Sequence, residues 1–128
     1  MIDTPATAVV AVVVTWNRRD LLRESLTALE AQTLAPVRIV VVDNASTDET
    51  SDMLAADFGH LDLVTLDVNT VGAGGFAVGV ERALTFGPDL VWLLDDDTVP
   101  TETTAERLVA AWSSYAPGGP RPAVLASR

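Results

Sequence analysis

The 128-residue chain contains no cysteine and no lysine, and each absence excludes a class of site. Without cysteine there is no disulfide framework, thiolate metal site or thiol nucleophile, which fits a reducing compartment. Without lysine there is no Schiff-base chemistry and no phosphate site that relies on a lysine. All eight positive charges are arginines scattered along the chain, against 18 acidic residues, so a nucleic-acid partner is not expected.

The sequence also lacks the long apolar run of a membrane-spanning helix. Its uninterrupted apolar run, from Ala8 to Val14, is far shorter than the ~20 residues that such a helix needs. The amino terminus, from Met1 to Pro5, carries an acidic residue and a proline where a secretory signal carries positive charge. We therefore expect a cytoplasmic protein, with contact at the inner face of the membrane left open.

Apolar residues make up 48% of the chain and fall into an alternating pattern. Runs of β-branched residues, typical of strands buried on both faces, alternate with segments of helical spacing. Strands are expected over 8–14, 37–42, 61–66 and 90–94, with a fifth beginning at 123–126, and helices over 20–32, 46–58, 76–86 and 101–115. This order predicts an α/β fold, a Rossmann-like parallel sheet with helices on both faces.

The extent of the domain and its packing can also be predicted. The length is typical of one domain, and because the last expected strand has barely begun, we expect residues 1–128 to be a single domain truncated at its carboxyl end. His60 is expected on the surface. Residues expected to pack in the interior are Phe76, Val80 and Leu84 on one helix face, and Trp92, Trp112 and Tyr115.

Polar residues follow the expected strands at the points where they end. In an open parallel sheet, ligands bind beyond the carboxyl ends of the strands, where the strand order reverses. The polar residues at these ends are Thr15 to Arg18, Asp43 and Asn44, Asn69, and Asp95 to Asp97. All four strands are therefore expected to bring polar groups to one rim.

The three consecutive aspartates are the most specific feature of that rim. At strand geometry Asp95 and Asp97 point to the same side, and a hard divalent cation would offset their repulsion. Mg²⁺ or Mn²⁺ bridging to substrate phosphates fits this ligand set better than Ca²⁺. The alternative is a solvated acidic turn in which Asp97 or Thr98 caps the next helix.

The other rim residues each have two interpretations. Asp43 can accept hydrogen bonds from a base or a ribose, or form an Asx-turn leading to a helix cap at Ser46 or Thr47. Trp16 can stack on a base or cover the top of the core. Two further segments also have two interpretations each. Asn17 and Arg18 can bind phosphate or form the solvated start of a helix. Gly72, Gly74 and Gly75 can allow a ligand to approach the backbone, or can only allow a tight loop.

Three segments, in order and spacing, resemble the amino-terminal half of a family 2 inverting glycosyltransferase of the GT-A fold. They are Val13–Arg18, Val41–Asp48, and Leu94–Asp97 as the DXD element. Asn69–Phe76 further resembles the asparagine- and glycine-rich stretch of bacterial galactofuranosyl- and rhamnosyltransferase-like members. Val71 stands where those members tend to have a glycine, and Val68 where a basic residue often precedes the asparagine. The resemblance covers about residues 8–115.

The resemblance implies a donor site for a UDP- or dTDP-sugar with Mn²⁺ or Mg²⁺. Its residues would be Thr15 and Trp16 at the base, Asp43 on the uracil or thymine ring, Asp95 and Asp97 on the metal, Asp96 near the ribose or sugar, and Asn69 and Gly72 beside them. It further implies transfer to a glycan or lipid-linked acceptor in cell-envelope polysaccharide synthesis. The general base would lie beyond Arg128, so the isolated chain is expected to be inactive or incomplete.

Two other functions are kept as alternatives. One is a non-catalytic nucleotide-binding module without an acceptor half. The other is a haloacid-dehalogenase-like phosphatase, which the run Leu93–Val99 resembles, with the first aspartate as nucleophile. That family places its motif on the first strand and uses a downstream lysine, and neither feature occurs in this chain.

Overall fold

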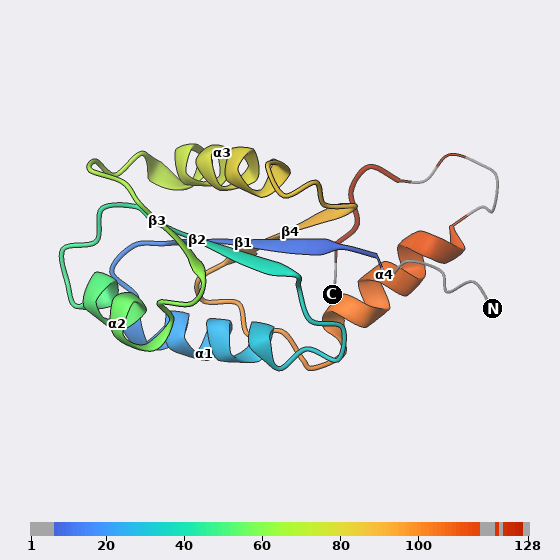
Figure 1. The fold of residues 1–128 in the computed structure, drawn as a ribbon, viewed down its shortest axis with the longest axis horizontal. Coiled ribbons are helices and arrows are strands. Elements are labelled where there is room, and N and C mark those ends of the chain that lie inside the picture. Colours follow the sequence, from blue (N-terminus) through green and yellow to red (C-terminus); the bar gives the residue numbers. More distant parts are fainter. Residues whose placement is uncertain (1–6, 116–119, 121, 127–128) are drawn as a thin grey trace.

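The computed structural model describes residues 7–115, 120 and 122–126, and Figure 1 shows that helices cover both faces of one sheet. The α/β class predicted above is confirmed. The elements are β1 (Val9–Thr15), α1 (Arg19–Glu30), β2 (Arg38–Asp43), α2 (Thr50–Asp57), β3 (Asp62–Thr65), α3 (Val71–Leu84), β4 (Leu90–Asp95) and α4 (Thr104–Ser114). Each predicted element is present except the fifth strand, because 123–126 is described without strand pairing.

All four strands are parallel, in the order β3-β2-β1-β4. The chain moves outward from β1 through β2 to β3 and then returns to the other side of β1 for β4. The strand order therefore reverses between β1 and β4, which is where open α/β sheets form their ligand crevice. Val14 pairs with Asp95 and Thr15 pairs with Asp43, so the ends of three strands meet there.

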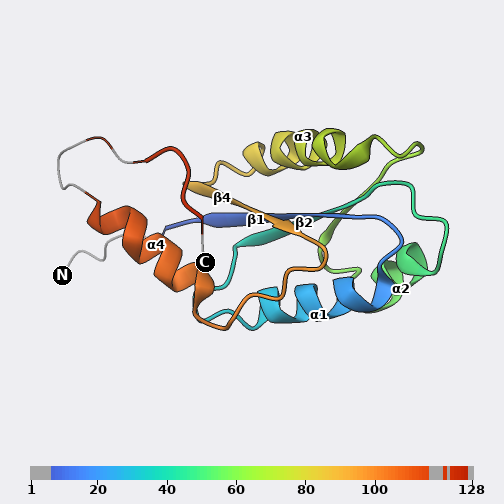
Figure 2. The same ribbon diagram turned by 180° about the vertical axis from the view of Figure 1, so that it is seen from behind.

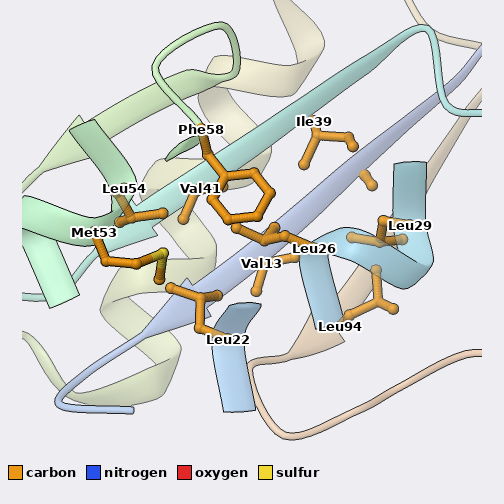
Figure 3. Close-up of a cluster of buried hydrophobic side chains, with 11 residues drawn as sticks. Val13, Leu22, Leu26, Leu29, Ile39, Val41, Met53, Leu54, Phe58 and Leu94 are labelled. Carbon is orange, nitrogen blue, oxygen red and sulfur yellow. The ribbon is translucent and has the colours of Figure 1, made fainter. Parts of the chain in front are cut away.

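Alternate residues of β1 are buried against different helices. Val10 and Val12 belong to the apolar cluster that α3 covers, whereas Ala11 and Val13 belong to the cluster of α1 and α2. Figure 3 shows the second cluster, in which three leucines of α1 contact the sheet beside Phe58. Because both faces are covered, the strand is apolar at every position from Val9 to Val14.

The glycine-rich stretch lies inside α3 and does not form a loop before it. At Gly79 a Cβ atom would lie 2.3 Å from Cγ1 of Val12, and at Gly75 it would lie 2.6 Å from Cγ1 of Val14. Contacts this short are incompatible with a side chain. The glycines therefore allow α3 to lie close against the sheet.

This close approach corrects the predicted face of α3. The buried face consists of Gly75, Gly79 and Ala83, whereas Leu84 is 60% exposed. Phe76 packs beside the cluster as a partly buried residue. Small residues form the face because the helix lies too close to the sheet for large ones.

The prediction that the aromatic residues pack in the interior is correct for some of them and wrong for one. Trp92 packs against the core cluster and Trp112 is partly exposed, but Tyr115 is 53% exposed, so the prediction that it packs is wrong. His60 is exposed as predicted and lies 2.8 Å from the carboxylate of Glu30. Among the residues that the structure describes, no helix has both the length and the hydropathy to span a membrane.

Candidate donor-binding site

The ends of β1 and β4 are joined by a buried hydrogen bond. The hydroxyl of Thr15 donates to Oδ2 of Asp96 over 2.9 Å, and the N–H of Trp16 lies 3.4 Å from the same oxygen. Thr15 is 2% exposed and Asp96 is 8% exposed. A turn directs Asp96 inward, because the N–H of Thr98 donates to the carbonyl of Asp95 over 3.1 Å. We call residues 95–98 the aspartate turn.

The aspartate turn separates its three carboxylates. Asp96 is buried, whereas Asp95 and Asp97 are exposed. Arg18 approaches the turn from the end of β1, with Nε 3.7 Å from Oδ1 of Asp96 and Nη1 3.9 Å from Oδ2 of Asp97. Burial raises the pKa of the Asp96 carboxyl above its ordinary value, and the hydrogen bonds from Thr15 and Trp16 and the charge of Arg18 oppose that rise.

The exposed carboxylates of Asp95 and Asp97 do not form a complete metal site by themselves. Within 7–115 and the described tail residues, no group of three or more His, Cys, Asp or Glu side chains is arranged to hold an ion. Mg²⁺ and Mn²⁺ are commonly held by one or two carboxylates together with substrate phosphates and water. Asp95 and Asp97 fit that incomplete set, because both are exposed beside the turn while Asp96 is engaged by Thr15.

Asp43 is hydrogen bonded within the connection after β2, which agrees with its interpretation as a turn residue, although its bond reaches the N–H three residues on and not two as in an Asx-turn. Its Oδ1 accepts a hydrogen bond from the N–H of Ser46 over 3.0 Å, and its Oδ2 accepts one from the hydroxyl of Ser51. The residue is only 2% exposed. The following helix begins at Thr50 and not at Ser46 as predicted, because residues 46–49 form the connection that these hydrogen bonds hold.

Asn17 links the ends of β1 and β2 and is not free to bind phosphate. Its Oδ1 accepts hydrogen bonds from the N–H groups of Thr47 and Asp48, at 2.7 and 3.2 Å. Its own N–H donates to the hydroxyl of Ser46 over 3.0 Å, and its φ of +49° turns the chain there. Of the pair Asn17 and Arg18, only Arg18 keeps a half-exposed side chain near the aspartate turn.

Asn44, expected at the rim but given no role there, makes three side-chain hydrogen bonds. Its Oδ1 accepts from the N–H and the hydroxyl of Thr70, at 2.8 and 3.1 Å, and its Nδ2 donates to the carbonyl of Val71 over 3.0 Å. Its backbone N–H donates to the carbonyl of Thr15 over 2.9 Å. A buried asparagine thus connects β1, β2 and the start of α3. Its sequence signals are its place directly after a buried strand and within the segment Val41–Asp48.

Asn69 and Gly72 lie at the amino end of α3. Oδ1 of Asn69 accepts a hydrogen bond of 2.8 Å from the N–H of Val71, whose φ is +57°. Gly72 faces open space, since a Cβ there would have no atom within 4 Å. In the part of the chain that the structure describes, neither residue is hydrogen bonded to the aspartate turn. Asn44 provides their connection to the rim.

A shallow depression is lined in part by Arg18, which contacts the aspartate turn, although no residue of the turn itself lines it. Its wall consists of residues 16–21 at the start of α1 and residues 47–49 before α2. Trp16 is 49% exposed on this wall, so it does not cover the core. Arg19 pairs with Glu49 across the depression. The exposed indole beside Arg18 gives the depression one apolar and one cationic surface.

Comparison with known proteins identifies the family. The model of glycosyl transferase family 2 matches residues 10–123. The chain belongs to this family. Galactofuranosyltransferase GlfT1 of Mycolicibacterium smegmatis is 40% identical over 101 residues, which cover 79% of this chain and 33% of that protein. The O-antigen chain rhamnosyltransferase RfbN of Salmonella typhimurium is 28% identical over 94 residues, 73% of this chain and 29% of that protein.

Solved structures have the same architecture. S. aureus TarS 1-349 in complex with UDP superposes with a TM-score of 0.72 at 24% identity, over 85% of this chain and 33% of that one. The mannosyltransferase PcManGT of Pyrobaculum calidifontis, in complex with GDP-Man and Mn²⁺, gives a TM-score of 0.68 at 27% identity, over 83% and 32%. The chain therefore corresponds to the amino-terminal region of a GT-A fold and spans about a third of the length of these relatives.

Membership of glycosyltransferase family 2 argues against the phosphatase alternative. The aspartate turn follows β4 and not the first strand, and the chain has no lysine. Past the turn, the carboxylate of Glu106 accepts a hydrogen bond of 2.8 Å from the hydroxyl of Thr33, at the far end of α1. Glu106 thus takes part in the contact between the end of α1 and α4.

Proposed function

We propose that this chain is the donor-binding part of a longer sugar transferase, and that it binds a UDP- or dTDP-sugar with Mn²⁺ or Mg²⁺ at the β1–β4 rim. The hydrogen bond between Thr15 and Asp96 carries the proposal. It fixes the aspartate turn against the end of β1, at the point where parallel sheets bind nucleotides. We assign the surrounding residues to two parts of the donor, the nucleoside and the diphosphate.

The nucleoside would bind beside β1 and β2. The half-exposed indole of Trp16 offers a face on which a base can stack. Asp43 lies next to Thr15 across the β1–β2 pair, with its carboxylate oriented by Ser46 and Ser51. A carboxylate held in this way accepts a hydrogen bond from the ring N–H of uracil or thymine once the connection at residues 46–49 admits the base.

The diphosphate would bind in front of the aspartate turn. Asp95 and Asp97 would hold the divalent cation, and Asp96, fixed by Thr15, would lie toward the ribose or sugar. Arg18 supplies a guanidinium at the same place, and guanidinium groups bind phosphate oxygens through two parallel hydrogen bonds. Asn69 and Gly72 would border the site from the start of α3, which Asn44 connects to the rim.

The reaction we propose is direct displacement at the anomeric carbon. A hydroxyl of a glycan or lipid-linked acceptor forms the new glycosidic bond as the bond to the nucleoside diphosphate breaks. Asp95 and Asp97 would hold a divalent cation, which would offset the charge that develops on the leaving diphosphate. Arg18 is placed to share that charge, and Trp16 and Asp43 hold the nucleoside. A general base outside this chain takes the acceptor proton. Cell-envelope polysaccharide synthesis would be the setting.

Calorimetry with UDP and MnCl₂ tests the proposal. We expect the chain to bind UDP in the presence of Mn²⁺, and we expect Asp97→Asn to remove the effect of Mn²⁺. Asp52→Asn, an exposed aspartate in α2, makes the same change in charge away from the rim and is expected to bind as the unmodified protein does. Absence of heat at millimolar UDP, or equal Mn²⁺ dependence in Asp97→Asn, would contradict the proposal. Binding without transfer by the full-length protein would favour the non-catalytic module.

A further inference from the structure

Two polar residues are buried on the leucine-rich face of α1 and just beyond its end. Ser25 is 0% exposed and Gln32 is 5% exposed, although their neighbours on this face are Leu22, Leu26 and Leu29. A buried polar group costs free energy unless it is hydrogen bonded. Both side chains are hydrogen bonded, and to the same stretch of chain, the segment between β4 and α4.

Ser25 binds the last residue of the aspartate turn. Its hydroxyl donates to the carbonyl of Thr98 over 2.6 Å. The N–H of Thr98 donates in turn to the carbonyl of Asp95, so Thr98 closes the turn with one backbone group and contacts α1 with the other. Leu94, directly before the turn, is packed against the α1 leucines. The turn is thus held from α1 on both sides of its aspartates.

Gln32 binds the other end of the segment. Its Nε2 donates to the carbonyl of Thr101 over 2.7 Å, and its Oε1 accepts from the N–H of Ala105 over 3.0 Å at the start of α4. The N–H of Thr33 donates to the carbonyl of Glu102 over 2.8 Å. Residues 98–101 form no helix or strand of their own. Figure 2 shows the segment, in orange, running beside α1. Its path is therefore set by Ser25 of α1 and by Gln32 just beyond the end of that helix.

We propose that Ser25 and Gln32 are positioning residues for the aspartate turn, and that they hold Asp95 and Asp97 in the arrangement that binds the divalent cation. The proposal rests on the proposed function, because it assigns the cation to these two carboxylates. Neither residue contacts the donor. They act through the backbone of the segment that they fix, Ser25 directly at the turn and Gln32 at the start of α4.

The positioning role can be measured first without any ligand, by amide hydrogen exchange of the free protein. We expect Ser25→Ala to lower the protection of the Thr98 amide by about fivefold, the equivalent of one hydrogen bond of ordinary strength, while amides of β2 keep theirs. Thr27→Ala is the matched control, since the exposed Thr27 hydroxyl donates to the carbonyl of Arg23 in its own helix and not to the segment between β4 and α4. Unchanged protection at Thr98, or equal loss throughout the sheet, would overturn the proposal.

The second readout is UDP affinity with MnCl₂ and with a chelator. Ser25→Ala and Gln32→Met are each expected to weaken the Mn²⁺-dependent gain in affinity by about fivefold, and to leave the affinity in chelator unchanged. A variant that is merely destabilised would lose both affinities together, and that result would also overturn the proposal. If the unmodified chain shows no Mn²⁺-dependent binding, the proposed function fails, while the exchange experiment still decides whether α1 fixes the turn.

Discussion

The hydroxyl of Thr15 and the carboxylate of Asp96, 81 positions apart in the chain, form a 2.9 Å hydrogen bond at the point where the strand order reverses. Thr15→Val keeps the shape of the side chain and removes the donor. A buried carboxylate that loses a donor is left less satisfied, so we expect a loss of about 1–2 kcal/mol in the free energy of unfolding. Urea denaturation at pH 7 measures it. Thr65→Val, at the exposed end of β3, should change it by less than about 0.5 kcal/mol.

Asp96 also predicts a pH dependence of stability. Because burial raises its pKa in the folded protein, the folded state binds the proton more tightly than the unfolded state does. Its contribution to stability is therefore greatest below about pH 4 and falls as the pH rises through the folded-state pKa. Asp96→Asn keeps an acceptor for Thr15 and removes the titration. We expect its stability relative to the unmodified protein to improve from pH 4 to pH 7.

Urea denaturation of both proteins across that range measures the difference. Asp52→Asn, in the exposed part of α2, makes the same change in net charge and is the control. If the difference between Asp96→Asn and the unmodified protein stays constant with pH, or moves in the opposite direction, the raised pKa is not a feature of the folded state.

Gly79 and Gly72 lie in the same helix, but we expect an added methyl group to have opposite effects on protein stability at the two positions. At Gly79 a Cβ would lie 2.3 Å from Cγ1 of Val12 and 3.2 Å from Cγ2 of Val42, so Gly79→Ala should destabilise the protein by about 2–3 kcal/mol. At Gly72 no atom lies within 4 Å, and alanine is favoured over glycine in helices, so Gly72→Ala should stabilise it by about 0.5–1 kcal/mol. Thermal and urea unfolding compare the two. Equal effects would mean that α3 does not lie this close to the sheet.

Trp16 provides an optical test of the donor site. Its indole is 49% exposed beside Arg18, whereas Trp92 packs against the core. We expect UDP to quench tryptophan fluorescence in the unmodified protein and not in Trp16→Phe. Loss of a stacking partner is worth about 1–3 kcal/mol per base, so Trp16→Ala should weaken UDP binding by about tenfold or more. Quenching that persists in Trp16→Phe would place the base elsewhere.

The sequence pattern predicts the sheet better than it predicts the rim. Burial on both faces requires uninterrupted apolar strands, so runs such as Val9–Val14 indicate a parallel sheet directly. The rim depends on contacts between distant residues, which no local pattern contains. Asn44 has the same local context as many turn residues, and only the fold brings Thr70 and Val71 to it. The glycines of α3 suggest a loop by propensity, whereas in the structure Gly75 and Gly79 lie in the helix and fit against valines of β1.

Val71 is the position at which sequence and backbone disagree most. Its φ of +57° is in the left-handed region, where a β-branched side chain is strained by about 1–3 kcal/mol, and its side chain is 74% exposed and so gains little from packing. Val71→Gly should relieve the strain and lose some chain entropy, for a net gain of about 1 kcal/mol. Its carbonyl would still accept the hydrogen bond from Asn44.

The control for this prediction is Val68→Gly, three residues earlier. Val68 is 70% exposed, and its φ is not positive, so glycine there adds freedom to the unfolded chain without relieving strain. Urea denaturation should show Val71→Gly above the unmodified protein and Val68→Gly below it by up to about 1 kcal/mol. If both substitutions lower stability equally, the left-handed conformation at Val71 costs nothing, and the Asn44 contacts alone account for the geometry at the start of α3.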